Sequence, residues 1–207
     1  MDNLESILTT HLSAQRIPIN LISESCCDAS FSTRPVIDFD AVKIRFCSKR
    51  HLHLPVQLKS ADCLHIDESK NAICFIEMKN IQNFISSNIH LHSDSTTYMA
   101  AFNKWLRKKT LDLKIKIIDS IFIITAAAGK YSSGTPDVSR ILDRKDVEIS
   151  YIVLTNIDND EYLEYSIASL ESKISYPLLT GPLFNAITVI SSDFEDFITR
   201  RMGTLRS

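Results

Sequence analysis

Two carboxylates and one lysine stand at matching ends of two neighbouring apolar runs. Asp62 opens the first run, and Glu77 and Lys79 close the second. Residues 67–71 separate the runs with the sequence DESKN, whose turn-forming composition predicts that the runs pair as an antiparallel hairpin. The chemistry open to these three side chains therefore depends on how the two strands align.

The alignment of the hairpin follows from its apolar side chains. If Ile66 pairs with Ile73, the next pair on that face is also apolar, and the pair after it sets Asp62 opposite Glu77. Opposed residues share a face of the sheet, with Cβ atoms about 5 Å apart. Lys79 lies two residues beyond Glu77 and points to the same face. The sequence thus predicts two carboxylates and an ammonium at one place.

A divalent cation would relieve the repulsion between two ionised carboxylates at this distance. Mg²⁺, or Mn²⁺ in its place, binds oxygen ligands, so Asp62 and Glu77 are the predicted ligands, with the backbone carbonyl of Met78 as a third. Lys79 beside the metal could orient or deprotonate a water molecule and face the charge that develops on a phosphate. This combination indicates hydrolysis of a phosphodiester bond.

The same residues resemble a known signature. Asp62, followed by a turn and then Glu77-Met78-Lys79 at the end of an apolar strand, resembles the motif of the PD-(D/E)xK, or restriction-endonuclease-like, nuclease superfamily. The resemblance implies that Asp62 and Glu77 are metal ligands and that Lys79 is the catalytic lysine. The proline that precedes the aspartate in the family is Ala61 here. The alternative is that these residues form an ordinary solvated strand end.

The resemblance also suggests a further acidic residue. Members of the family often supply one from their first helix, and Glu5 is the candidate in this sequence. Candidate contacts to the phosphates of a substrate are Lys49, Arg50, Lys59 and Lys104, although a solvated loop or a helix end would account for these cations equally well.

The elements that position these residues follow from hydrophobic periodicity. Helices are predicted at the N-terminus, with apolar residues from Leu4 to Leu12, and over residues 92–109. Strands are predicted at residues 36–47, 119–129, 148–155 and 186–191, besides the hairpin, and two more helices at residues 158–173 and 193–202. The fold class predicted is α/β, a central mixed β-sheet flanked by helices, and the resemblance implies a restriction-endonuclease-like core.

Length and composition limit the alternatives. The 207 residues predict one domain. The resemblance implies that its core covers about residues 1–126 and that about residues 127–207 form a C-terminal extension. A net charge of −2 is not that of a general polyanion binder, so nucleic acid would need a local basic patch. Five cysteines without a C-x-x-C pair suit the reducing cytoplasm, and no apolar run approaches the ~18 residues that predict a membrane span.

The predicted function is a metal-dependent nuclease that hydrolyses DNA, in preference to RNA, in a role such as defence against foreign DNA. One alternative is a non-catalytic or partner-activated subunit that uses the same fold as an interaction scaffold. Another is an enzyme that cuts RNA with the same metal site. A protein partner or a homodimer is compatible with each of these.

Overall fold

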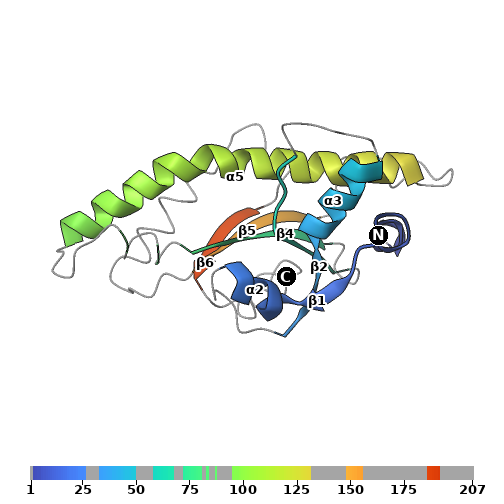
Figure 1. Cartoon of the computed structure of the whole chain (residues 1–207), viewed down its shortest axis with the longest axis horizontal. Helices are drawn as coiled ribbons and strands as arrows, with labels where there is room; N and C mark the ends of the chain where they lie inside the picture. Colours follow the sequence, from blue (N-terminus) through green and yellow to red (C-terminus); the bar gives the residue numbers. More distant parts are fainter. Residues whose placement is uncertain are drawn as a thin grey trace.

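The computed structural model describes residues 2–26, 33–49, 58–67, 72–80, 83, 87, 95–131, 148–155 and 186–191. Their principal helices are α1 (Asp2–Leu12), α2 (Ile19–Cys26), α3 (Phe39–Lys49) and α5 (Ser95–Tyr131). Their strands are β1 (Arg16–Pro18), β2 (Pro35–Asp38), β3 (Cys63–Asp67), β4 (Ala72–Lys79), β5 (Glu148–Thr155) and β6 (Ala186–Ser191). Figure 1 shows α5 as a long helix that lies across the sheet.

The six strands form one sheet in chain order, from β1 to β6. Strands β1 to β4 pair antiparallel, whereas β4, β5 and β6 run parallel to one another. The sheet is therefore mixed and carries helices, which confirms the α/β class. Strands β5 and β6 come from beyond residue 127 and lie in the same sheet as the N-terminal strands.

The hairpin has the register that the apolar residues predict. Ile66 pairs with Ile73, and the last pair of the ladder is Cys63 with Ile76. The next step outward places Asp62 opposite Glu77. The N-terminal helix and the strands at residues 148–155 and 186–191 are also confirmed.

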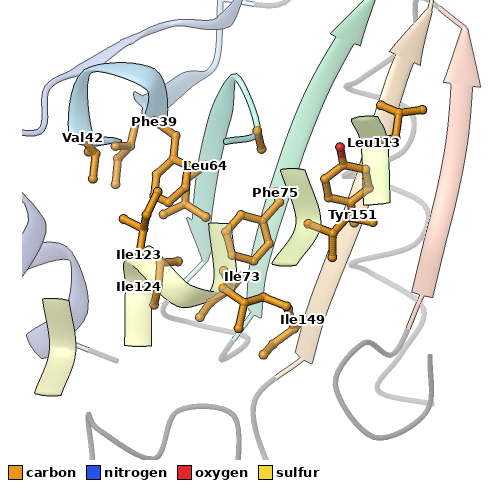
Figure 2. Close-up of a cluster of buried hydrophobic side chains, with 14 of the residues drawn as sticks. Phe39, Val42, Leu64, Ile73, Phe75, Leu113, Ile123, Ile124, Ile149 and Tyr151 are labelled. Carbon is orange, nitrogen blue, oxygen red and sulfur yellow. The ribbon is translucent and has the colours of Figure 1, made fainter. Parts of the chain in front are cut away.

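Two apolar clusters cover the two faces of the sheet. The larger one joins α1, α3 and α5 to the face that bears Leu64, Phe75 and Tyr151, and Figure 2 shows these side chains packed together. The smaller one joins Ile19 of α2 to the opposite face, which bears Cys74 and other buried side chains. Because side chains alternate along a strand, Asp62 and Glu77 share the face of Leu64 and Phe75 and so lie under α5.

The strand predicted at residues 36–47 is wrong beyond Asp38. The chain becomes helical at Phe39, and α3 continues to Lys49. Asp38 caps this helix, because its Oδ1 accepts a hydrogen bond of 3.0 Å from the backbone N–H of Ala41. The alternating apolar residues that indicated a strand also fit a helix, in which Phe39, Val42 and Phe46 are buried on one side.

The helix predicted at residues 92–109 and the strand predicted at residues 119–129 belong to one helix, so the strand prediction is wrong. No glycine or proline interrupts the chain from Ser95 to Ala128. Buried side chains recur at helical spacing through Leu113, Ile117 and Ile124, all at most 2% exposed. At 1.5 Å per residue the 37 residues of α5 span about 55 Å.

Several predictions fall outside the described residues. They are the two helices at residues 158–173 and 193–202 and the centre of the hairpin turn. The single domain and its boundaries stay predictions. Among the helices that the structure describes, none is long and apolar enough to cross a membrane.

Candidate functional site

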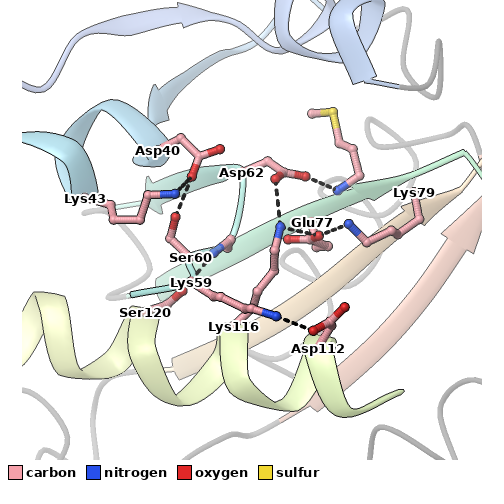
Figure 3. A network of polar contacts seen from close by, with 12 residues as sticks. Asp40, Lys43, Lys59, Ser60, Asp62, Glu77, Lys79, Asp112, Lys116 and Ser120 are labelled. Carbon is pink, nitrogen blue, oxygen red and sulfur yellow. Dashed lines mark hydrogen bonds and ion pairs between the residues drawn. The ribbon is translucent and has the colours of Figure 1, made fainter. Parts of the chain in front are cut away.

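The two predicted carboxylates lie close together under α5, as Figure 3 shows. Glu77 is completely buried near the end of β4, and Asp62, just before β3, is 8% exposed. Both contact one nitrogen, the Nζ of Lys116, which lies 2.6 Å from Oε1 of Glu77 and 3.2 Å from Oδ1 of Asp62. The convergence on one cation therefore exists in the structure, and the cation is a lysine.

Backbone hydrogen bonds hold Asp62 in place. The N–H of Phe39, at the start of α3, donates to the carbonyl oxygen of Asp62 over 3.1 Å. The N–H of Ala61 donates to the hydroxyl of Ser120 on α5 over 2.9 Å. The side chain is fixed as well, because Oδ2 of Asp62 accepts a hydrogen bond of 2.7 Å from the N–H of Met78. The hairpin and two helices thus determine the position of this carboxylate.

The lysine of the motif contacts the same glutamate. Nζ of Lys79 donates to Oε1 of Glu77, the oxygen that also accepts from Lys116. The contact of Met78 with Asp62 is through its amide, so the role of the Met78 carbonyl as a metal ligand stays a prediction. Two carboxylates and two ammonium groups therefore form one compact cluster.

Burial dominates the electrostatics of this cluster. It raises the pKa of Glu77 from 4.5 to about 7, the charge of Asp62 adds to the rise, and Lys79 and Lys116 oppose it. Burial lowers the pKa of Lys116, but the charges of Glu77 and Asp62 and the hydrogen bonds to both outweigh it, so this pKa lies above its ordinary value. Lys116 is therefore charged at neutral pH.

Among the described residues, two buried polar atoms of the cluster lack a hydrogen-bond partner. Oε2 of Glu77 and the hydroxyl oxygen of Tyr151 make no hydrogen bond within the described part of the chain. Tyr151 lies on β5, and burial, followed by the charges of Glu77 and Asp62, raises the pKa of its hydroxyl well above the ordinary value. An unsatisfied carboxylate oxygen is costly in a protein interior, so Oε2 of Glu77 is a candidate position for a further interaction.

These residues fit a divalent cation of the oxygen-binding type. Asp62 and Glu77 already converge on one positive charge, and Oε2 of Glu77 is available as a further ligand atom. No group of three or more His, Cys, Asp or Glu side chains suited to a metal occurs in the described ranges. A metal here would be held by two carboxylates, with water and substrate oxygens completing its coordination.

A cleft of about 400 Å³ opens beside the carboxylates. Its lining side chains include five lysines and two aspartates: Lys43, Lys59, Lys79, Lys109, Lys116, Asp40 and Asp112. Lys43 pairs with Asp40 over 2.5 Å, and Lys59 pairs with Asp112. With Asp62 and Glu77 included, which Lys79 and Lys116 contact, five lysines face four carboxylates, so the cleft carries a small excess of positive charge.

Of the three predicted phosphate contacts that the structure describes, Lys59 lines the cleft and the other two do not. Lys49 donates to the backbone carbonyl of His11, and Lys104 is exposed on α5 outside the cleft lining. Arg50 lies outside the described residues. The predicted additional acid, Glu5, is not brought to the carboxylates: it forms an ion pair of 2.5 Å with Arg16.

Lys116 is the residue that sequence reasoning missed. It lies one residue before Ile117 in the buried stripe of α5, and three residues after Leu113. A prediction of one continuous helix from Ser95 onward would have placed Lys116 on the edge of that buried stripe, facing the hairpin. Lys109, seven residues or about two helical turns before Lys116, lines the same cleft.

No family model, no curated protein and no solved structure matches the chain. The resemblance to the PD-(D/E)xK superfamily was based on the motif of Asp62, Glu77 and Lys79 and on the predicted order of elements up to about residue 126. The strand predicted at residues 119–129 in that order is wrong, and the resemblance stays a prediction. The geometry of the carboxylates, the lysines and the cleft is the basis for any functional proposal.

Proposed function

We propose that this chain is a metal-dependent nuclease that hydrolyses phosphodiester bonds of DNA, built on a restriction-endonuclease-like core. One observation carries the proposal: two buried carboxylates converge on one cation beside Lys79, at the edge of a cleft rich in lysines. Carboxylates that are buried beside one another at the edge of a cleft, with a raised pKa as at Glu77, are typical of functional sites.

Asp62 and Glu77 would hold Mg²⁺ or Mn²⁺. Such a metal, when bound, lowers the pKa of a coordinated water molecule and polarises a phosphate oxygen. The amide of Met78 keeps Asp62 oriented through its hydrogen bond of 2.7 Å, so this carboxylate needs little reorganisation to act as a ligand. Glu77 is oriented by burial within the sheet.

Lys79 would act directly on the substrate. Its side chain is 20% exposed and lines the cleft, so its ammonium can reach an anion there while it remains beside Glu77. A fixed positive charge at this position would orient the attacking water and stabilise the negative charge that develops on the phosphate. The other lysines of the cleft would bind the neighbouring phosphates of the chain.

A second candidate function is a non-catalytic scaffold that assembles with a partner. The observation in its favour is Lys116, whose ammonium contacts both carboxylates and, together with Lys79, balances their charge. In that case the cluster of charges would be purely structural. The two candidates differ in one measurable property, the affinity for divalent cations.

The experiment is a cleavage assay with purified protein. Linear and circular DNA, and RNA in a parallel reaction, are incubated with Mg²⁺, with Mn²⁺ and with a chelator. We expect DNA to be cut only in the presence of metal, and a preference for RNA would assign the same site to the other substrate. Absence of cleavage together with absence of metal binding would support the scaffold and refute the nuclease.

A further inference from the structure

The ammonium of Lys116 can reach two neighbouring places, the carboxylate pair and the open cleft. Its ammonium contacts Asp62 and Glu77, yet its side chain is 19% exposed and lines the open cleft. A lysine side chain turns about four flexible carbon–carbon bonds, so the ammonium can move from one environment to the other without movement of α5.

The ammonium and a divalent cation require the same space. Nζ of Lys116 lies 2.6 Å from Oε1 of Glu77 and 3.2 Å from Oδ1 of Asp62. Mg²⁺ would lie about 2.1 Å from each ligand oxygen, between the same two carboxylates. A metal bound by both carboxylates would therefore meet the nitrogen at a distance that neither sterics nor charge permits.

The balance of charge leads to the same conclusion. A metal binds ionised carboxylates, and with Asp62 and Glu77 both ionised the ammonium groups of Lys79 and Lys116 balance their charge. A divalent cation added to this buried cluster would leave an excess of two positive charges, which is unfavourable in a low dielectric. Departure of Lys116 reduces the excess to one charge and leaves Lys79 in place.

The structure also offers a place for the displaced ammonium. Asp112 lies four residues before Lys116 on α5 and lines the same cleft. Residues four apart on a helix are neighbours, and an aspartate N-terminal to a lysine is a favourable order. Asp112 already accepts a hydrogen bond from Lys59, which lowers the pKa of Asp112, so a second cation would join an ionised carboxylate.

We propose that Lys116 is a built-in competitor for the cation site: it occupies the carboxylates in the metal-free protein and turns into the cleft, toward Asp112, when a divalent cation binds. This inference rests on the metal site of the proposed function and goes beyond it. Lys116 lowers the affinity for metal, and its release adds a positive charge to the cleft at the moment when a phosphate of the substrate is to be bound.

The test measures the affinity for Mn²⁺ by calorimetry or electron paramagnetic resonance, in the absence of nucleic acid. The variants are Lys116→Met and, as matched control, Lys109→Met, which removes the same charge from the same cleft and helix without any described contact to the carboxylates. We expect Lys116→Met to bind Mn²⁺ at least about tenfold more tightly than the unaltered chain. The control should change the affinity by less than about threefold.

Each outcome is decisive. Equal or weaker binding by Lys116→Met than by Lys109→Met overturns the competition but leaves the metal site intact. No binding by any of the proteins overturns the metal site itself, and with it the nuclease. Thermal unfolding supplies a second readout: Lys116→Met should melt lower than the unaltered chain without metal and recover when Mn²⁺ is added, whereas a merely structural lysine would leave a loss that metal does not restore.

A measurement on the unaltered chain covers the case in which Lys116→Met does not fold. In protein labelled with ¹⁵N at lysine side chains, the paired ammonium of Lys116 should exchange its protons slowly and give a distinct signal. Addition of diamagnetic Mg²⁺ should move this signal to the position of a solvated lysine. A signal that stays unchanged while Mg²⁺ binds would contradict the displacement.

Discussion

Lys116, in the middle of α5, holds Oε1 of Glu77 at 2.6 Å, although 39 residues separate them along the chain (Figure 3). The contact joins the longest helix to the buried end of β4. It also brings Asp62 into the same cluster, since the same ammonium lies 3.2 Å from that carboxylate. The position of α5 across the sheet and the chemistry of the candidate site are therefore coupled.

Asp62→Asn should abolish metal-dependent cleavage and leave the fold intact. The amide oxygen of asparagine can still accept the hydrogen bond from Met78, while the charge needed to hold a divalent cation is lost. We expect the rate with Mg²⁺ to fall by about 100-fold or more, measured on a DNA substrate. Lys108→Met, an exposed change on α5 outside the cleft lining, should keep the original rate.

Cleavage should become faster as the pH rises toward neutrality. A metal binds the ionised form of Glu77, whose pKa is raised to about 7 by burial and by Asp62. Below this pH the rate at limiting Mg²⁺ should rise by about tenfold per pH unit, and above it the rate should level off. A profile that is flat between pH 5.5 and 7 would show that Glu77 is not a ligand.

The free energy of unfolding should also depend on Glu77. Because its pKa is 4.5 in the unfolded chain and about 7 in the folded protein, the folded state retains a proton in this window. Below pH 4.5 the carboxyl is protonated in both states and does not lower the free energy of unfolding. As the pH rises from 4.5 to 7 the unfolded chain loses this proton more readily, so the free energy of unfolding decreases. In metal-free buffer, Glu77→Gln should therefore gain stability relative to the unaltered chain over this window, by about 3 kcal/mol at most. A constant difference in denaturant unfolding would contradict the assignment.

Glu5→Gln should leave the affinity for metal unchanged. Glu5 pairs with Arg16 near the surface, away from the two carboxylates that converge under α5. Loss of this partly exposed pair should lower the free energy of unfolding by less than about 1 kcal/mol. A loss of Mn²⁺ affinity in calorimetry would instead place Glu5 in the metal site.

The single helix α5 can be tested with two adjacent isoleucines. Ile117 is fully buried against the sheet, and Ile118 is 49% exposed. Ile117→Ala should destabilise the protein by about 2–5 kcal/mol, because it leaves a cavity in the core. Ile118→Ala should change the free energy of unfolding by less than about 1 kcal/mol. Similar losses for both variants in urea unfolding would contradict the helical placement.

The local pattern of residues determined the hairpin and the pairing of its carboxylates. A slip of one residue would turn Ile66 and Ile73 to the wrong face, so the apolar residues admit only one register, and this register also aligns Asp62 with Glu77. Information confined to about twenty neighbouring residues was sufficient, because strand pairing across a short turn is a local event.

The hydrophobic pattern was ambiguous where the same residues fitted both the two-residue period of a strand and the 3.6-residue period of a helix. Val42 and Phe46 are compatible with alternation in a strand and with one face of a helix, and the cap at Asp38, together with burial against the core, favours the helix. In α5 the apolar run that predicted a strand is buried on one side only, since Phe122 is 51% exposed. Only the packing of neighbouring elements distinguishes these cases.

The identity of the cation between the carboxylates was decided by tertiary structure alone. Lys116 lies 54 residues from Asp62 and reaches it because α5 docks across the sheet on its buried stripe. No spacing in the sequence encodes such a contact, since it depends on the register of a helix against strands that are distant along the chain. The sequence determined that two acids meet, and the docking of a helix determined which positive charge meets them.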